Sequence, residues 1–127
     1  MKKYLLIISF ILISLSSFGQ IFVGDVDINQ ADSVSVIEVY VDRTPFKSVD
    51  VYVDFGQKDN SRAGGLGSRD ADLRINDPVT KNRMNFKSTV AVLNYFDKNG
   101  WEQFDANLAL MRGNTIGSFF YFRRKNR

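Results

Sequence analysis

A change of hydrophobic period at Gly100 constrains the fold of this chain more than any other feature of its sequence. Before it, Val90, Leu93 and Phe96 recur at helical spacing and form an apolar stripe. Ser88 precedes the stripe and is a suitable N-cap, because its hydroxyl can accept a bond from an unpaired amide at a helix start. Gly100 can adopt the left-handed conformation that closes a helix. The pattern therefore predicts a helix between Ser88 and Gly100.

The residues after Gly100 predict a strand. From Phe104 to Leu110, apolar and polar residues alternate, which places one apolar row on a face of a sheet. Trp101 lies between the helix and this strand, where its ring would hold the two elements together. We therefore expect Ser88, Leu93, Gly100 and Trp101 to be structural residues.

Three other segments have the composition of strands, with β-branched or aromatic residues at alternate positions: 34–41, 49–55 and 116–123. The short connection between the first two contains Pro45 and favours an antiparallel pair. A turn signal at 76–78 allows an extra short hairpin before the helix. The predicted fold is α+β, an antiparallel sheet of about four main strands with one helix packed on one face, in the order β-β-α-β-β.

The second half of the chain carries a set of short motifs that can be compared with known proteins. They are Phe86-Lys87-Ser88, Leu93-Asn94-Tyr95, Gly100-Trp101-Glu102 and an aromatic strand that ends in Arg123-Arg124-Lys125. Together they resemble a group of small, uncharacterised secreted bacterial proteins. They are also similar to a shorter bacterial domain of unknown function with a Leu-Asn helix, a Gly-Trp-Glu corner and a terminal basic strand. The resemblance implies a fold and supplies no activity.

Residues 1–19 have the form of a secretory signal, with a basic start, an apolar segment and small residues before the cleavage position. The apolar segment is short and interrupted by serines, so we favour cleavage over retention as a membrane anchor. We expect the mature protein to be exported, periplasmic or secreted, with no transmembrane segment. Residues 20–33 show no sustained period and predict an extended or flexible lead-in, whereas 34–127 predict a single α+β domain.

The positive charge of the chain is concentrated at its two ends. The sequence has 17 basic and 14 acidic residues, and Lys2 and Lys3 belong to the signal. Four more basic residues lie within 123–127, so the body between has 11 basic against 14 acidic residues. An acidic body argues against a nucleic-acid partner. Attachment of the basic tail to an anionic cell-envelope surface remains an alternative function.

The chain has few residues suited to catalysis, because it contains no histidine and no cysteine. Disulfides, most zinc sites and the common nucleophile and base pairs are therefore absent. We expect no cofactor, no metal and no catalysis. A minimal carboxylate-dependent hydrolase built on Asp50 and Asp54, which share a strand face, is the alternative. A calcium loop from Asp25 fails, because Gln30 and Val36 replace the required glycine and carboxylate.

The face of the sheet that the helix leaves uncovered is the candidate binding site. Strand alternation places Tyr40, Tyr52, Phe119, Tyr121 and Arg123 there. Aromatic rings framed by charges suit recognition of a protein, a peptide or a glycan. Two alternatives remain open, that residues 21–28 fold back over this face or that it forms a second small core. The sequence thus predicts a small exported, non-catalytic binding module of unknown partner and oligomeric state, which uses this face or the glycine-rich loop around 64–67.

Overall fold

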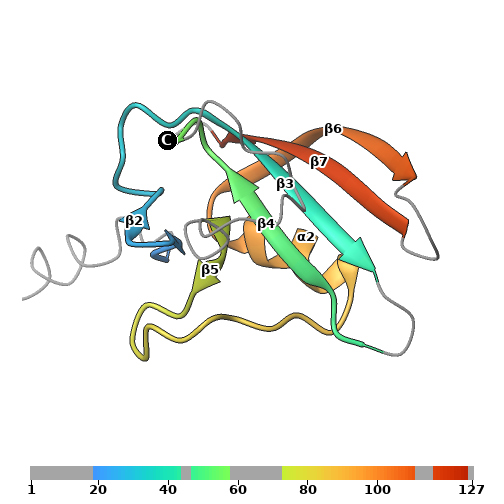
Figure 1. Cartoon of the computed structure of the whole chain (residues 1–127). Coiled ribbons are helices and arrows are strands. Elements are labelled where there is room, and N and C mark those ends of the chain that lie inside the picture. Colours follow the sequence, from blue (N-terminus) through green and yellow to red (C-terminus); the bar gives the residue numbers. More distant parts are fainter. Residues whose placement is uncertain (1–18, 44–46, 58–72, 111–115, 126–127) are drawn as a thin grey trace, which may run out of the picture.

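The computed structural model describes residues 19–43, 47–57, 73–110 and 116–125. In this part of the chain it contains one helix and two antiparallel sheets, of four and three strands, which confirms the predicted α+β class (Figure 1). The predicted signal segment, apart from Gly19, and the glycine-rich loop fall outside the described residues. Within them, no helix is long and apolar enough to cross a bilayer.

The larger sheet contains the four strands that hydrophobic alternation predicts. Its side chains alternate between a buried face, which includes Val39 and Val53, and an outer face, which includes Tyr40 and Tyr52. We use "outer face" for the side of this sheet opposite the helix. In spatial order the strands are β4 (Asp50–Asp54), β3 (Val36–Arg43), β7 (Ile116–Arg124) and β6 (Trp101–Leu110).

Helix α2 (Thr89–Lys98) covers the buried face. Ser88 is its N-cap, and its hydroxyl accepts a hydrogen bond from the Ala91 amide at 3.1 Å. The helix buries Val92 and Phe96, and the Phe96 ring lies 4.9 Å from that of Phe122 on the sheet. Gly100 follows the helix with a φ of 92°, a left-handed conformation that glycine adopts without steric cost.

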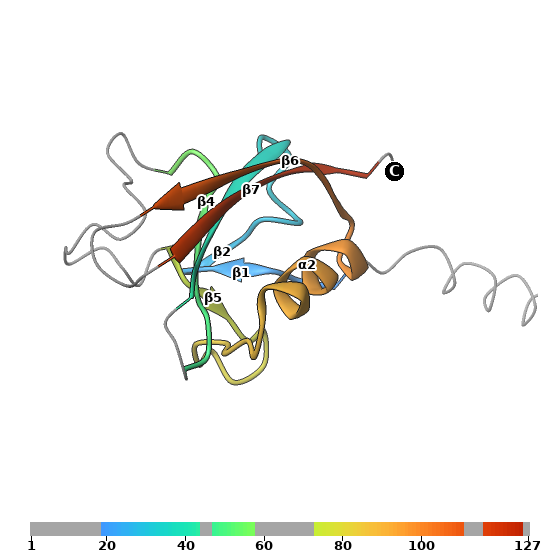
Figure 2. The same cartoon turned by 90° about the vertical axis from the view of Figure 1, so that its right-hand side faces the viewer.

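Residues 20–33, which we expected to be an extended or flexible lead-in, are instead part of the core. They form β1 (Phe22–Val23) and β2 (Val26–Asp27), which join β5 (Ile75–Asn76) in the smaller sheet, in the order β2-β1-β5. Ile21, Val23 and Ile28 are buried in the same cluster as the helix. Figure 2 shows β1 and α2 on the same side of the larger sheet. This segment therefore does not fold back over the outer face.

The Trp101 side chain is fully buried at the corner between helix and strand, and its partner comes from the N-terminal segment. The indole nitrogen donates to Asn29 Oδ1 at 2.7 Å. The Asn29 amide nitrogen in turn donates to the carbonyls of Asn99, at 3.1 Å, and Gly19. One buried asparagine thus joins the N-terminal segment to both the end of α2 and the start of β6.

Arg124 fastens the same N-terminal segment to the end of β7. Its guanidinium lies 5.3 Å from the Trp101 ring centroid and donates to four backbone carbonyls. The acceptors are those of Ile28 (2.6 Å), Asn29 (3.1 Å), Ala31 (2.6 Å) and Val34 (2.5 Å). Arginine suits this place because its planar head carries five N–H donors that can serve several acceptors at once.

The prediction that Phe104 shares one apolar row with Ala106 on β6 is wrong. A β-bulge between Gln103 and Asp105 shifts the register against β7. The Phe104 ring consequently lies 6.4 Å from that of Tyr121 on the outer face, whereas Ala106 pairs with Phe120, which packs against the core. A bulge adds a residue to one strand and so reverses the alternation beyond it.

Candidate functional site

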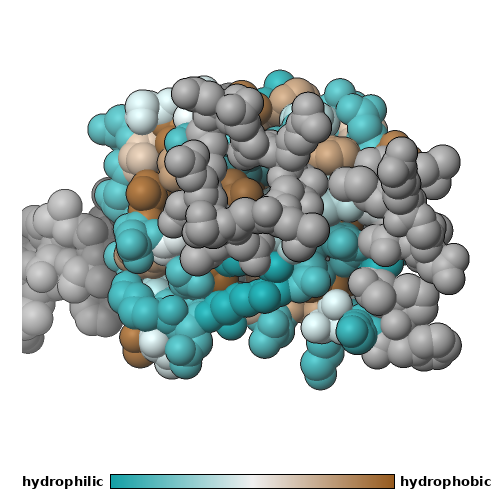
Figure 3. Space-filling model, viewed as in Figure 1, coloured by the Kyte–Doolittle hydropathy of each residue, from teal (hydrophilic) through white to brown (hydrophobic). Residues whose placement is uncertain are grey.

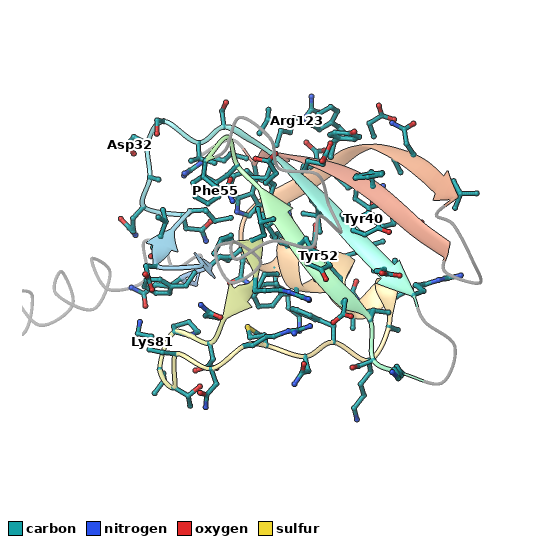
Figure 4. The ribbon with its side chains drawn as sticks, viewed as in Figure 1. Asp32, Tyr40, Tyr52, Phe55, Lys81 and Arg123 are labelled. Atoms are coloured by element: carbon teal, nitrogen blue, oxygen red, sulfur yellow. The ribbon has the colours of Figure 1, made fainter. Side chains whose placement is uncertain are left out.

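The structure brings the five predicted binding residues onto the outer face. Tyr40 lies at its centre, with Tyr52 opposite on β4 and Phe119 opposite on β7. The ring of Tyr40 is 6.0 Å from that of Tyr52 and 4.8 Å from that of Phe119. Figure 4 shows Tyr40 and Tyr52 side by side on neighbouring strands and Arg123 further along the same side of the sheet. The five residues are not equally accessible, however.

Tyr40 is a packed residue rather than an exposed platform. Its side chain is 1% exposed, and its hydroxyl lies over Gly117, where a Cβ atom would collide with the tyrosine ring. Among the residues that the structure describes, neither the Tyr40 hydroxyl nor Asp42 Oδ1 has a hydrogen-bond partner. Burial and the nearby Asp50 carboxylate raise the pKa of Asp42, an effect that Arg74 partly offsets. An ionised Asp42 therefore costs stability, since desolvation and a like charge both disfavour it.

The raised pKa of Asp42 leads to a pH-dependent prediction. Asp42→Asn should stabilise the fold at pH 7, by less than about 1 kcal/mol because solvent screens the partly exposed charge. At pH 3, where the carboxyl is protonated in both folded and unfolded chains, the gain should disappear. The raised pKa fixes this sign, because stability is lost as the pH rises through the folded-state value. Urea unfolding at the two pH values, with the exposed Asp32→Asn as control, measures it; equal gains at both would contradict it.

The β4 side of the outer face is occupied by a side chain that sequence patterns do not reveal. The guanidinium of Arg74 lies 3.8 Å from the centroid of the Tyr52 ring and donates to the Tyr52 hydroxyl at 2.6 Å. It also bonds Asp50 at 3.1 Å, and Arg83 pairs with the same carboxylate. Arg74 lies at an irregular position before β5, where no period indicates its direction. Arg74 thus covers the part of the predicted aromatic surface that Tyr52 forms.

The β6 and β7 side of the face is accessible. Phe104 is 50% exposed, lies beside Tyr121 and has the Arg123 guanidinium 5.8 Å from its ring centroid. Arg123 also bonds Glu102 at 3.0 Å. A hydrogen bond to Glu38, together with burial, raises the pKa of the Tyr121 phenol. We call Phe104, Tyr121, Arg123, Glu38 and Glu102 the β6–β7 patch. Where grey atoms do not cover the view, Figure 3 shows a surface of mainly hydrophilic side chains with scattered hydrophobic ones.

The geometry does not favour the hydrolase alternative. Asp50 and Asp54 are four residues apart on β4, so about 13 Å of strand separates their backbones. Carboxylates that cleave a glycosidic bond lie about 5 to 9.5 Å apart. Asp50 is also held by two arginines, and Asp54 Oδ1 accepts the Gly56 amide at 2.8 Å. Neither carboxylate is placed to act with the other on one bond.

The described tail cations are turned toward the protein. Arg124 serves backbone carbonyls, Arg123 pairs with Glu102, and Lys125 Nζ lies 2.7 Å from Asp97. This arrangement gives little support to the alternative in which the tail attaches to an anionic surface. Among the described residues no group of three or more Asp and Glu side chains is arranged to hold a metal ion.

Comparison with known proteins adds no identity to this geometry. No protein-family model matches the chain, and neither a curated protein nor a solved structure matches it. The site therefore has to be interpreted from its own chemistry.

Proposed function

We propose that this protein is a small exported binding module that recognises its partner through the β6–β7 patch, without catalysis. The observation that carries the proposal is the exposed Phe104 ring beside Tyr121 and Arg123. An accessible aromatic side chain flanked by an arginine is typical of the residues that dominate binding energy at interfaces. The proposal moves the predicted site along the sheet, from Tyr40 and Tyr52 toward the edge strand β6.

The patch suits a polar, charged partner. Glu38 and Glu102 lie beside the aromatic rings, and Glu102 is only partly neutralised because its pair with Arg123 is exposed to solvent. Such a rim adds specificity and speeds association with an oppositely charged molecule. A protein or peptide partner is favoured over a glycan, because aromatic side chains and arginine are the residues enriched at protein interfaces.

The experiment is amide hydrogen exchange of residues 20–127, alone and with an extract of the host's cell envelope. We expect slower exchange in β6 and β7 on binding, and no change in β4. Phe104→Ala should weaken the effect about tenfold, as the loss of an interfacial aromatic contact would. The matched control is Val90→Ala, since Val90 is also exposed but lies on the helix. Equal exchange with and without extract, or equal loss in both variants, would refute the proposal.

A further inference from the structure

Strand β6 is the long free edge of the larger sheet. It has ten residues and, among the strands that the structure describes, pairs with β7 alone. The opposite edge, β4, has five residues; Val49 just before it forms a bridge with Phe86, and Arg74 packs over Tyr52. An unpaired strand edge presents N–H and C=O groups to which another chain can bond. The two edges of the sheet therefore differ in length and in cover.

The side chains of β6 are accessible on both faces of the sheet. Every residue from Glu102 to Leu108 is exposed. Phe104 lies on the outer face, whereas Leu108, which is 70% exposed, pairs with Ser118 and points to the other side. A strand laid beside β6 would thus gain apolar contact above and below the sheet. Cross-strand pairs of this kind are what stabilise a sheet.

The charge of this edge selects among possible occupants. Residues 101–110 contain Glu102 and Asp105 and no lysine or arginine, although lysine is the usual protection of an edge strand. Arg123 on β7 pairs with Glu102 through a solvent-exposed salt bridge, which neutralises that carboxylate only in part. A second copy of this chain would bring identical acids to one seam, where like charges repel. A basic strand would meet them favourably.

One local contact explains how a basic strand would pair with β6 more readily than a neutral one. The Ala106 amide donates to Asp105 Oδ1 at 2.8 Å, so the neighbouring side chain satisfies it. Together with the bulge, this bond discourages addition of a neutral strand. A lysine or arginine on an incoming strand would attract the Asp105 carboxylate away from Ala106. The Asp105 carboxylate then pairs with the incoming cation, and the freed Ala106 amide donates to a backbone carbonyl of the incoming strand.

We propose that β6 is a docking edge for an extended segment of another protein in which basic residues alternate with apolar ones. The segment adds to the sheet as a fifth strand, with its cations on the outer face near Glu102 and Asp105, their apolar stems along Phe104, and its apolar side chains on the opposite face against Leu108. The inference rests on the proposed function, since it names the chemistry of the partner that the β6–β7 patch recognises.

The test uses a seven-residue peptide in which lysine alternates with valine and threonine, added to residues 20–127. We expect amide exchange at 102–108 to slow at least about tenfold, with no change at 50–54. A peptide with glutamate in place of lysine should have no effect. The lysine peptide methylated at alternate backbone nitrogens should also have none, because strand addition needs those amides.

Two variants that introduce the same residue, lysine, at different places test where the peptide binds. Leu108→Lys places a cation on the docking edge and should weaken peptide binding about tenfold. Val90→Lys introduces the same residue at an exposed position on α2 and should leave binding unchanged. Both positions are exposed, so neither variant should lose stability.

The outcomes distinguish failure of the proposed function from failure of the basic-strand inference. Binding of the methylated or the glutamate peptide would overturn strand addition or the charge preference, respectively. Self-association that Leu108→Lys abolishes would make a second copy the occupant and overturn the inference. If the envelope extract protects β6 and β7 while the lysine peptide protects neither, the proposed function stands and the basic-strand inference fails. If neither protects, both fail.

Discussion

Trp101→Ala should lower the free energy of unfolding by about 3–5 kcal/mol, the range measured for removing a large buried aromatic side chain. Trp101 has no exposed surface, and its indole is the donor to Asn29 Oδ1 at 2.7 Å. The substitution would open a cavity at the corner between α2 and β6. It would also leave the asparagine oxygen buried without that donor. Urea denaturation monitored by far-ultraviolet circular dichroism measures the change.

Trp101→Phe separates the two contributions. It keeps most of the ring volume and removes the indole N–H, so we expect a loss of about 1–3 kcal/mol, the usual cost of leaving a buried polar group unsatisfied. The control is Phe104→Ala, an exposed aromatic three residues along the same strand, which should cost less than about 1 kcal/mol. A loss below about 1 kcal/mol for Trp101→Ala would show that the corner does not hold the core together.

Arg124→Ala should destabilise the protein by at least about 3 kcal/mol. The guanidinium donates to four backbone carbonyls of the segment from Ile28 to Val34. Bonds to a charged donor contribute about 1.5–3 kcal/mol each, and truncation removes this donor from four partly buried carbonyls at once. Arg124→Lys should recover only part of the loss, because an ammonium group cannot reproduce the planar fork. Thermal and urea unfolding measure both variants.

The neighbouring arginine provides the matched control. Arg123 lies on the outer face, where an exposed salt bridge joins it to Glu102, so Arg123→Ala should cost less than about 1 kcal/mol. If the two alanine variants were equally stable, the carbonyl cluster would not be a structural contact. Peptides covering residues 20–33 should also exchange faster in Arg124→Ala than in Arg123→Ala, since the Arg124 guanidinium donates to carbonyls of that segment.

The local patterns of the sequence account for most of the architecture. Alternation predicts the strands of the larger sheet, and the N-cap at Ser88 with the left-handed Gly100 predicts the limits of the helix. These signals succeed because each depends on residues within a few positions of one another. The smaller sheet is predicted only in part. The turn signal at 76–78 indicates a short hairpin, and Asn76 in β5 does form an antiparallel bridge with Arg83, whereas the two-residue strands β1 and β2 cannot express a period.

The features that were not predicted depend on contacts between distant residues. Asn29 and Trp101 are 72 positions apart, and nothing near Asn29 in sequence indicates that its amide would be buried beside an indole. Arg74 lies 22 positions from Tyr52, whose ring it covers. The bulge that moves Phe104 to the outer face arises from the fit of β6 against β7. The last two, the Arg74 contact and the bulge, change the candidate site.

The bonds from Arg124 to the segment around Ile28 have a consequence for the order of folding. They join residues 96 positions apart, and β7 inserts between β3 and β6 in the larger sheet. The core therefore cannot close until residue 124 has been made and the last strand has found its place. Contacts of such long range slow folding. If the chain is exported as proposed, this delay would keep it unfolded while it is threaded across the membrane, without the need for a dedicated inhibitor of folding.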